Sequence, residues 1–203
     1  MTHTYTPHPD LHARGSVYRT GIPGLFYIAH QPNADARGFF LEVAAIDDIE
    51  GAWGRPFRVV QVNHSRSVQN VVRGLHAEDW NKLVMVASGV AFCALADVRP
   101  ASPTFGKVET FLLGHGRDAG AAGGALFIES GVANSFCVVE GPVDYVYAVD
   151  KRYTDRDPKG DQAIALFDPD LNIQWPIDRA QMIISERDRQ SKTLRALFPE
   201  RFA

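Results

Sequence analysis

Short apolar runs separated by turn-forming residues dominate the chain. Val, Ile, Phe and Tyr, which favour strands, are concentrated in these runs. The runs are Phe57–Val62, Lys82–Ala87, Val90–Val98, Val108–Leu113, Ala125–Ile128, Ser135–Val139 and Val143–Val149. Gly and Pro lie between them, and the Ser88-Gly89 pair predicts a tight turn between two strands. Because no long amphipathic stretch separates the runs, the pattern predicts an all-β antiparallel sandwich or barrel.

Helical patterns are short and lie outside the predicted barrel. We expect helix only near Ile46–Ile49 and in the C-terminal stretch Glu186–Leu197. The chain has 203 residues, enough for one well-buried domain, and no repeat or linker divides it. We therefore expect one domain over residues 1–203, with an N-terminal arm over about 1–23 and a C-terminal helical segment over about 186–203.

Composition and charge narrow the class of protein. Hydrophobic residues make up 45% of the sequence and charged residues 22%, which is typical of a folded globular chain. The formal net charge is -3 and no run of basic residues occurs, so we expect no nucleic-acid partner. No window has the apolar length of a membrane span, and the N-terminal residues lack the apolar stretch of a signal peptide. We expect no membrane partner and a cytoplasmic protein, in which Cys93 and Cys137 are buried free thiols.

One predicted strand carries a row of polar side chains. Gln61, Asn63, Ser65 and Ser67 occupy alternate positions, and alternate residues of a strand face the same side of a sheet. Such a row is consistent with a solvent-facing edge strand. It is also consistent with a barrel interior that holds a polar ligand.

Titratable residues follow this strand. Arg73 and His76 lie in the next segment, and Lys82 opens the strand after it. If His76 and Lys82 point inward, the interior contains a titratable base and a fixed cation, which is a pattern typical of an active site. Tyr145 and Tyr147 share one face of a later strand, where packing is the ordinary role of an aromatic residue.

The chain resembles the dTDP-4-dehydrorhamnose 3,5-epimerase family in segments that extend from about Gly24 to Leu194. The segments are Asp35–Glu42 (DARGFFLE), Gln61–Ser67 (QVNHSRS), Asn70–His76 (NVVRGLH), Lys82–Val84 (KLV), Asp97–Gly106 (DVRPASPTFG), Asp168–Pro176 (DPDLNIQWP) and Ser185–Asp188 (SERD). Each segment is short, but all of them occur in the family's order, which makes the resemblance specific.

The resemblance implies a fold and an activity. The fold is a double-stranded β-helix, the cupin or jelly-roll barrel, with short peripheral helices. The activity is that of an isomerase in deoxysugar and carbohydrate biosynthesis, which epimerises C3 and/or C5 of a nucleotide-diphospho-4-keto-6-deoxy sugar. Its type reaction converts dTDP-4-dehydro-6-deoxyglucose to dTDP-4-dehydrorhamnose. The resemblance also implies a homodimer that acts on a dTDP-sugar and uses no metal or organic cofactor.

The same resemblance assigns roles to single residues. His76 matches the general base, Asp188 the carboxylate that orients it, Tyr147 the opposing acid and Lys82 the cation beside the substrate oxygens. Tyr153 matches the aromatic residue that stacks on the nucleotide base. The other matches are substrate contacts: Gln61, Asn63, Arg73, Asn134 and Arg187, with Arg37 and Glu42 supplied by the neighbouring subunit.

These residue types suit proton transfer at carbon. A 4-keto group acidifies the hydrogens on C3 and C5, because the resulting carbanion delocalises into an enolate. A neutral imidazole such as His76 can take such a proton, and a carboxylate stabilises the imidazolium that forms. A cation such as Lys82 stabilises the enolate oxygen. Inversion requires a second donor on the opposite face of the ring, and Tyr147 is suitable.

Departures from the family pattern leave a narrower epimerase possible. Asn134 replaces a substrate-side His, and Glu78 replaces a Gln. The loop from His76 to Lys82 is shorter than in the family, and Lys159 aligns with a ligand-binding acid in a longer loop. One alternative is therefore a single-carbon enzyme, acting only at C3 or only at C5 of a different nucleotide sugar.

Two further alternatives lie outside epimerisation. A metal-dependent cupin enzyme could use His76, Glu78 and His64 as ligands. The usual His-x-His pair is absent, however, and Lys82 would repel a divalent cation, so we expect no metal site. A non-catalytic sugar-binding cupin is the other alternative, and it would not need an acid, a base and an orienting carboxylate together.

Overall fold

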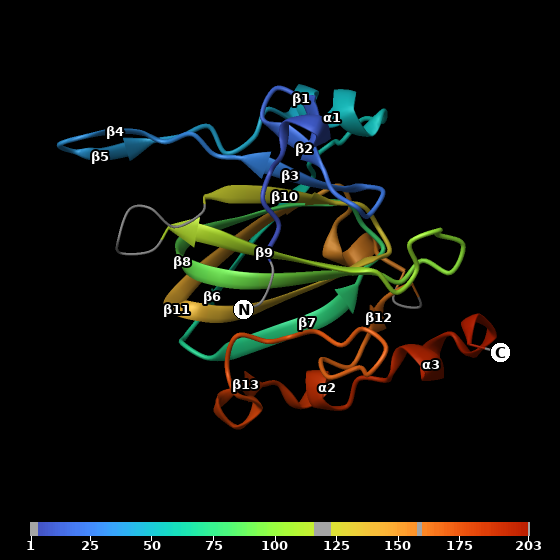
Figure 1. Cartoon of the computed structure of the whole chain (residues 1–203). Helices are drawn as coiled ribbons and strands as arrows, with labels where there is room; N and C mark the ends of the chain where they lie inside the picture. The colour runs from blue at the N-terminus through green and yellow to red at the C-terminus, as the bar shows by residue number, and fades with distance from the viewer. Residues whose placement is uncertain (1–3, 116–122, 158–159, 203) are drawn as a thin grey trace.

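The computed structural model describes residues 4–115, 123–157 and 160–202, and within these ranges most regular structure is strand (Figure 1). The strands are β1 His12–Arg14, β2 Val17–Arg19, β3 Leu25–Ala29, β4 Asn33–Asp35, β5 Gly38–Phe40, β6 Gln61–Ser67, β7 Val71–Ala77, β8 Lys82–Asp97, β9 Val108–His115, β10 Gly124–Ile128, β11 Val132–Val149, β12 Gln162–Ala163 and β13 Ile183–Ile184. The α-helices are α1 Ile46–Trp53, α2 Glu186–Arg189 and α3 Leu194–Leu197, with 3-10 turns η1 Pro9–Leu11, η2 Tyr153–Asp155, η3 Arg179–Gln181 and η4 Pro199–Arg201. The all-β class predicted from the sequence is confirmed.

Two long strands, β8 and β11, take part in both layers of the barrel. They pair with each other along most of their length. The first half of β8 pairs with β10 and its second half with β9. The first half of β11 pairs with β7 and its second half with β6. One layer therefore runs β1-β2-β3-β10-β8-β11-β6 and the other β9-β8-β11-β7-β12, so the two sheets enclose a common interior.

The sequence predicted a turn where β8 instead bends. The Ser88-Gly89 pair lies inside β8, so the predicted tight turn is wrong. Gly89 has a φ of 77°, which favours glycine and bends the strand as it passes between layers. A Cβ at Gly89 would lie 2.5 Å from the carbonyl oxygen of Pro142 in β11. The two shared strands therefore touch at their bends, and Gly141-Pro142 likewise lies inside a single strand.

Element ends differ from the predicted ones for local reasons. Of the predicted strand Phe57–Val62 only the last two residues are strand, and β6 continues to Ser67. The first helix extends to Trp53, where Gly54 closes it in a left-handed conformation. The predicted C-terminal helix is divided into α2 and α3, because the backbone at Lys192 pairs with Ile164 instead of continuing the helix.

The ends of the chain and one hairpin surround the barrel. Residues 12–19, within the expected N-terminal arm, form β1 and β2 and extend one sheet beyond β3. The C-terminal segment with α2 and α3 lies along the other layer (Figure 1). The β4–β5 hairpin, called the arm below, projects away from the barrel. No helix in the described part of the chain is long and apolar enough to cross a membrane.

The largest apolar cluster fills the space between the two layers. It includes inward-facing side chains of both halves of β8 and β11, such as Val84, Leu95, Phe136 and Tyr145. A second cluster joins α1 to the outer face of β3 and β10. Two others join the C-terminal segment to the outer face of the second layer. Burial on both sides of the strands under α1 and under the C-terminal segment accounts for the continuous apolar runs of the sequence.

A buried carboxylate organises the turn that follows β8. Asp97 is fully buried and accepts hydrogen bonds from Arg99 Nε at 2.8 Å, Arg99 Nη2 at 2.7 Å and Thr104 Oγ1 at 2.6 Å. Burial alone would raise the pKa of Asp97, but the hydrogen bonds from Arg99, Ser102 and Thr104 outweigh it and lower that pKa. The segment Asp97–Gly106, which carries part of the family resemblance, therefore stabilises the fold and does not line the cavity at one end of the barrel.

We expect Asp97→Asn to lower the free energy of unfolding at neutral pH by about 3 kcal/mol, because it leaves buried donors facing an amide. Since the pKa of Asp97 is depressed in the folded state, its contribution is present above the ordinary value of 3.8 and is lost as pH falls through the folded value. Urea denaturation at neutral and acidic pH measures both effects. Asp10→Asn, at an exposed position, is the control, and equal stability of the two variants would contradict the prediction.

Candidate active site

A cavity of about 300 Å³ opens at one end of the barrel interior. Eight of the predicted catalytic and substrate-binding residues line it: Arg73, His76, Lys82, Asn134, Tyr147, Tyr153, Arg187 and Asp188. Ser65, Glu78, Phe136, Tyr145, Arg156 and Ser185 complete the lining. The structure therefore brings together residues from both layers and from the C-terminal segment.

A bulge in β7 turns Arg73 and His76 toward the same side. Asn134 of β11 lies opposite His76, and Phe136 lies opposite Arg73, so two steps on β11 correspond to three on β7. Regular alternation would place Arg73 and His76 on opposite faces, and the extra residue corrects this. Gly74 has a φ of 116°, and a Cβ there would lie 2.5 Å from Cβ of Ser135. The site therefore depends on glycine at this position.

His76 is paired with a buried carboxylate. Its Nε2 lies 2.7 Å from Asp188 Oδ1, and the other carboxylate oxygen accepts a hydrogen bond from the Gly74 backbone at 3.4 Å. Asp188 is held in the first turn of α2, where its N–H donates to Ser185 Oγ at 3.1 Å. Burial alone would raise the pKa of Asp188, but the bond from His76 and its charge lower it. An ionised Asp188 that accepts from Nε2 leaves Nδ1 of His76 with the lone pair that can take a proton.

Tyr147 faces the cavity from the other layer. It lies on the second half of β11, opposite Asn63 of β6, whereas His76 lies on β7. Its hydroxyl makes no hydrogen bond to any described residue. Burial, and next the negative charge of Glu78, raise the pKa of Tyr147, so the hydroxyl is protonated at neutral pH. The arrangement places a base and a proton donor on separate walls of one cavity.

Lys82 reaches the cavity with its charge already paired. Its buried side chain forms an ion pair with Glu78. The Glu78 carboxylate also accepts from Trp80 Nε1 at 3.2 Å and from Arg156 Nη1 at 3.2 Å. Burial alone would raise the pKa of Glu78, but the charge and hydrogen bond of Lys82, together with His76 and Trp80, outweigh burial and lower that pKa. Glu78 therefore reduces the positive charge that the sequence assigned to Lys82.

Arg156 forms a wall of the cavity that the sequence analysis missed. Its guanidinium lies 4.6 Å from the ring centroids of both Trp80 and Tyr153. It also pairs with Asp161 at 2.7 Å. Sequence spacing gives no indication that Arg156 contacts Glu78, because the two residues are 78 positions apart.

The polar row of β6 faces inward, as one of its two interpretations predicted. Along β6, the side chains of the polar row are more buried than Val62, His64 and Arg66, which lie between them. Ser65 lines the cavity, whereas Gln61 and Asn63 lie beyond its lining. Gln61 Nε2 donates to Asn63 Oδ1 at 2.6 Å, and the Tyr153 backbone donates to Gln61 Oε1 at 3.1 Å. Gln61 therefore supports the segment that holds Tyr153.

Two of the predicted contacts, Arg37 and Glu42, lie on or near the arm. Arg37 is at its tip, where the side chain is 90% exposed and pairs with Asp35 at 2.6 Å. Glu42 follows β5 and is also exposed. Within one chain neither residue lines the cavity.

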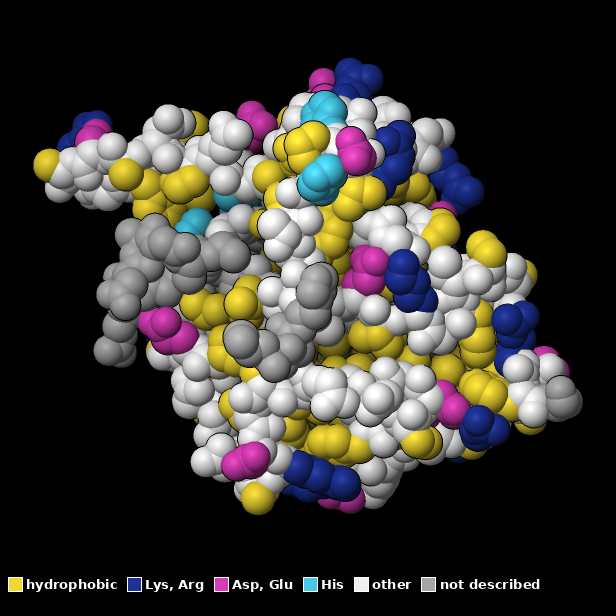
Figure 2. All heavy atoms as spheres, in the orientation of Figure 1, with side chains coloured by type: hydrophobic (Ala, Val, Ile, Leu, Met, Phe, Trp, Pro, Cys, Tyr) yellow, Lys and Arg dark blue, Asp and Glu magenta, His cyan; other side chains and the backbone are white. Residues whose placement is uncertain are grey.

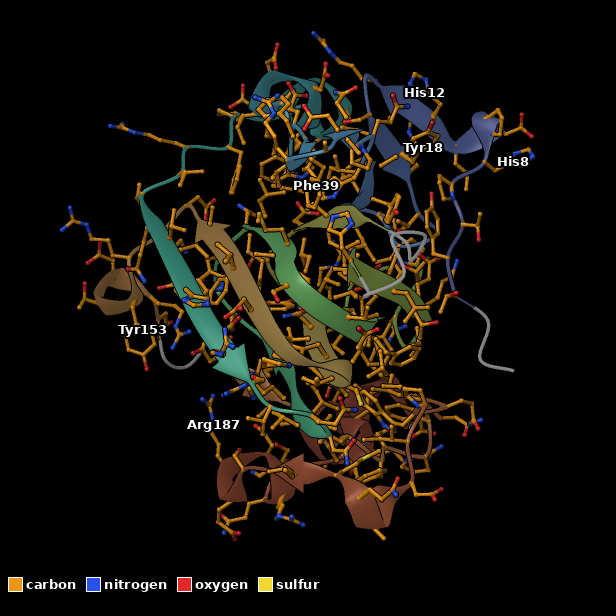
Figure 3. The ribbon with its side chains drawn as sticks, turned by 90° about the vertical axis from the view of Figure 1, so that its left-hand side faces the viewer. His8, His12, Tyr18, Phe39, Tyr153 and Arg187 are labelled. Carbon is orange, nitrogen blue, oxygen red and sulfur yellow. The ribbon has the colours of Figure 1, made fainter. Side chains whose placement is uncertain are left out.

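Tyr153 and Arg187 lie at the opening of the cavity, and Arg187 points from α2 toward the strands (Figure 3).

The proposed metal ligands do not converge. His64 lies on the outer face of β6, 2.8 Å from Asp144, and Glu78 is paired with Lys82. Among the described residues there is no group of three or more His, Cys, Asp or Glu side chains that could hold a metal ion. Lys159, which the sequence aligned with a ligand-binding acid, lies outside the described residues.

Comparisons with known proteins find relatives in sequence and in structure. The sequence matches the family described as dTDP-4-dehydrorhamnose 3,5-epimerase over residues 19–196. It is 34% identical over 178 residues to the dTDP-4-dehydrorhamnose 3,5-epimerase of Pseudomonas aeruginosa, covering 86% of this chain and 93% of that protein.

Solved structures show the same barrel. A 4-keto-6-deoxy sugar epimerase from the novobiocin biosynthetic gene cluster of Streptomyces spheroides has a TM-score of 0.80 and 29% identity, covering 98% of this chain and 93% of that one. A dTDP-6-deoxy-D-glucose-3,5-epimerase of Legionella pneumophila, solved in complex with dTDP-4-keto-L-rhamnose, has a TM-score of 0.78 and 32% identity, covering 91% and 95%. The cupin-type barrel predicted from the sequence is confirmed.

Proposed function

The chain belongs to the dTDP-4-dehydrorhamnose 3,5-epimerase family and is an isomerase, and from this we propose that it inverts C3 and C5 of a dTDP-4-keto-6-deoxy sugar without a cofactor. One observation carries the proposal. The His76–Asp188 pair and the Tyr147 hydroxyl face a single cavity from different layers of the barrel. That arrangement suits removal of a proton from one face of a sugar ring and its return on the other.

The residues divide the reaction between them. Nδ1 of His76 takes the hydrogen from the carbon beside the keto group, and Asp188 stabilises the imidazolium that forms. Arg73 and the Lys82–Glu78 pair lie around the cavity in which the enolate oxygen becomes negative. Tyr147 then donates its proton to the opposite face of the same carbon, which inverts it. Once His76 has released its proton to water and Tyr147 has regained one, turning the sugar in the cavity presents the second carbon to the same groups.

The opening suits a nucleoside diphosphate. Arg73, Arg156 and Arg187 line the cavity, and guanidinium groups bind phosphate oxygens by paired hydrogen bonds. Tyr153 is 63% exposed beside them, with its outer ring face available to stack on a nucleotide base. A cytoplasmic location is part of the proposal and agrees with the free, buried Cys93 and Cys137.

Proton NMR in deuterium oxide tests the proposed function. The protein is incubated with dTDP-4-dehydro-6-deoxyglucose in the presence of EDTA, and the C3 and C5 signals are followed. We expect both signals to disappear and an inverted product to form. Exchange at one carbon only would favour a single-carbon epimerase, and activity that returns only with added metal would favour the metal-dependent alternative.

A homodimer is also part of the proposal. Phe39 and Phe40 on the arm are 55% and 73% exposed, and Figure 2 shows hydrophobic side chains along it. Val62, on the outer face of β6, is 63% exposed. Apolar surface of this kind marks interaction sites. We propose that the arm packs on a second copy and brings Arg37 and Glu42 to that copy's cavity.

Mixing two inactive chains tests the shared site. We expect Arg37→Ala and His76→Ala homodimers to be weakly active or inactive, and mixed dimers to recover up to about half of the activity per site. One of the two cavities in a mixed dimer then contains both an intact His76 and an intact Arg37. The measurement is turnover after refolding the two chains together, with the mixed dimer isolated through different affinity tags. Isolated mixed dimers that show no recovery would mean that each site is built within one chain.

A further inference from the structure

Tyr145 is buried at the inner end of the cavity and holds one side chain there. It is 3% exposed and stacks on Phe136, with ring centroids 4.4 Å apart and an interplanar angle of 14°. Its hydroxyl donates to Asn134 Oδ1 at 3.2 Å, which is the one hydrogen bond that this hydroxyl makes among the described residues. The ring is therefore fixed by packing and the hydroxyl by Asn134.

Asn134 is the direct neighbour of the proposed general base. It lies opposite His76 in the β7–β11 pair, and residues opposite each other in an antiparallel pair have adjacent side chains. A side-chain amide has one acceptor oxygen and two N–H donors. Because Oδ1 of Asn134 is occupied by Tyr145, the NH₂ end is the part left for the cavity that Asn134 lines.

An uncharged hydrogen-bond donor beside His76 can stabilise the enolate. Negative charge develops on the keto oxygen when His76 removes the neighbouring hydrogen. Lys82 is the cation expected to stabilise that charge, but it is already paired with Glu78. The second carboxylate oxygen of Glu78 accepts a hydrogen bond from Arg156. A second donor beside His76 offsets this loss of positive charge. An amide supplies it without titrating, unlike a His at the same position.

We propose that Tyr145 is a positioning residue, which fixes the Asn134 amide so that its N–H donates to the keto oxygen of the substrate during proton removal. The inference rests on the proposed epimerase function. Tyr145 itself moves no proton. Its contribution is to prevent the amide from turning its oxygen toward the developing negative charge, where it would repel the enolate.

Steady-state kinetics of four variants test the proposal. Tyr145→Phe keeps the stacked ring and should lower kcat about tenfold with little change in KM. Asn134→Ala should lower kcat about a hundredfold, in the range found when one oxyanion donor is removed. The double variant should be no slower than Asn134→Ala, because Tyr145 acts only through Asn134. Asn134→Asp keeps an acceptor for Tyr145 but has no N–H, so it should be as slow as Asn134→Ala while its Tm stays near that of the parent protein.

Tyr27→Phe is the matched control. Tyr27 is buried in the same apolar cluster, and its hydroxyl donates to the Gly123 carbonyl at 2.8 Å, away from the cavity lining. It should lower Tm by an amount similar to Tyr145→Phe and leave kcat unchanged. Tyr145→Phe with the parent kcat, or effects of Tyr145→Phe and Asn134→Ala that add in full, would overturn the proposal. If the parent protein exchanged the hydrogen of neither carbon, the proposed function itself would be refuted. That result differs from the outcomes above, which concern the variants alone.

Discussion

His76→Ala should abolish deuterium exchange at both C3 and C5, with a fall in rate of about 10²–10⁴-fold or more. The imidazole is the group in the cavity that combines a free ring nitrogen with an orienting carboxylate, since Nε2 is 2.7 Å from Asp188. Lys82 and Glu78 neutralise each other as an ion pair and are not available to start the reaction. Exchange of each carbon is followed by proton NMR in deuterium oxide, which detects proton removal even when no inverted product forms.

Controls separate this loss of the base from a loss of folding. His8→Ala changes an exposed histidine near the N-terminus and should keep the parent rate at both carbons. Circular dichroism and Tm should show that the His76→Ala chain is folded, since His76 lies on the cavity wall and not in an apolar cluster. Exchange that persists at one carbon in His76→Ala would mean that a second base serves that carbon, which contradicts the assignment of both proton removals to His76.

Local sequence rules predict some of this site well. The side-chain period of two correctly placed the polar row of β6 on one face, because residues two apart on a regular strand share a side. The same rule fails on β7. There the bulge at Gly74 brings Arg73 and His76 to one face, although their odd spacing would separate them. A glycine inside a strand is the signal that could have suggested this bulge.

Long-range contacts account for what the sequence could not predict. Glu78 was noted as a departure from the family. Its pairing with Lys82 is local, but its contact with Arg156 joins residues 78 positions apart. Tyr145 looked like an ordinary packing residue, and its contact with Asn134 arises because both face inward from one long strand. The sequence also could not show that β8 is continuous, since a glycine with positive φ, such as Gly89, can either reverse a strand or bend it.

Tyr147 is suited to a test that separates proton removal from inversion. Its ring packs against Trp80 and Tyr145, with centroid distances of 6.5 and 6.2 Å. Its hydroxyl has no hydrogen-bond partner among the described residues, so its removal leaves no buried group unsatisfied. Burial and the charge of Glu78 raise the pKa of Tyr147, so the hydroxyl is protonated at neutral pH and can donate to the enolate. Phenylalanine at this position should therefore keep the fold and the Michaelis complex.

Tyr147→Phe should continue to wash substrate hydrogen into deuterium oxide while inverted product falls by about 10²-fold or more. His76 and Asp188 are intact in this variant, so the enolate still forms, and His76 returns a deuteron to the face from which the hydrogen left. The ratio of exchange to inversion, measured by NMR on one sample, is independent of protein concentration and of partial unfolding. Asp188→Asn is the comparison, because misorienting His76 should slow exchange and inversion together without changing their ratio. Inversion by Tyr147→Phe at the parent rate would show that Tyr147 only packs, and Tyr153 would then be the next donor to test.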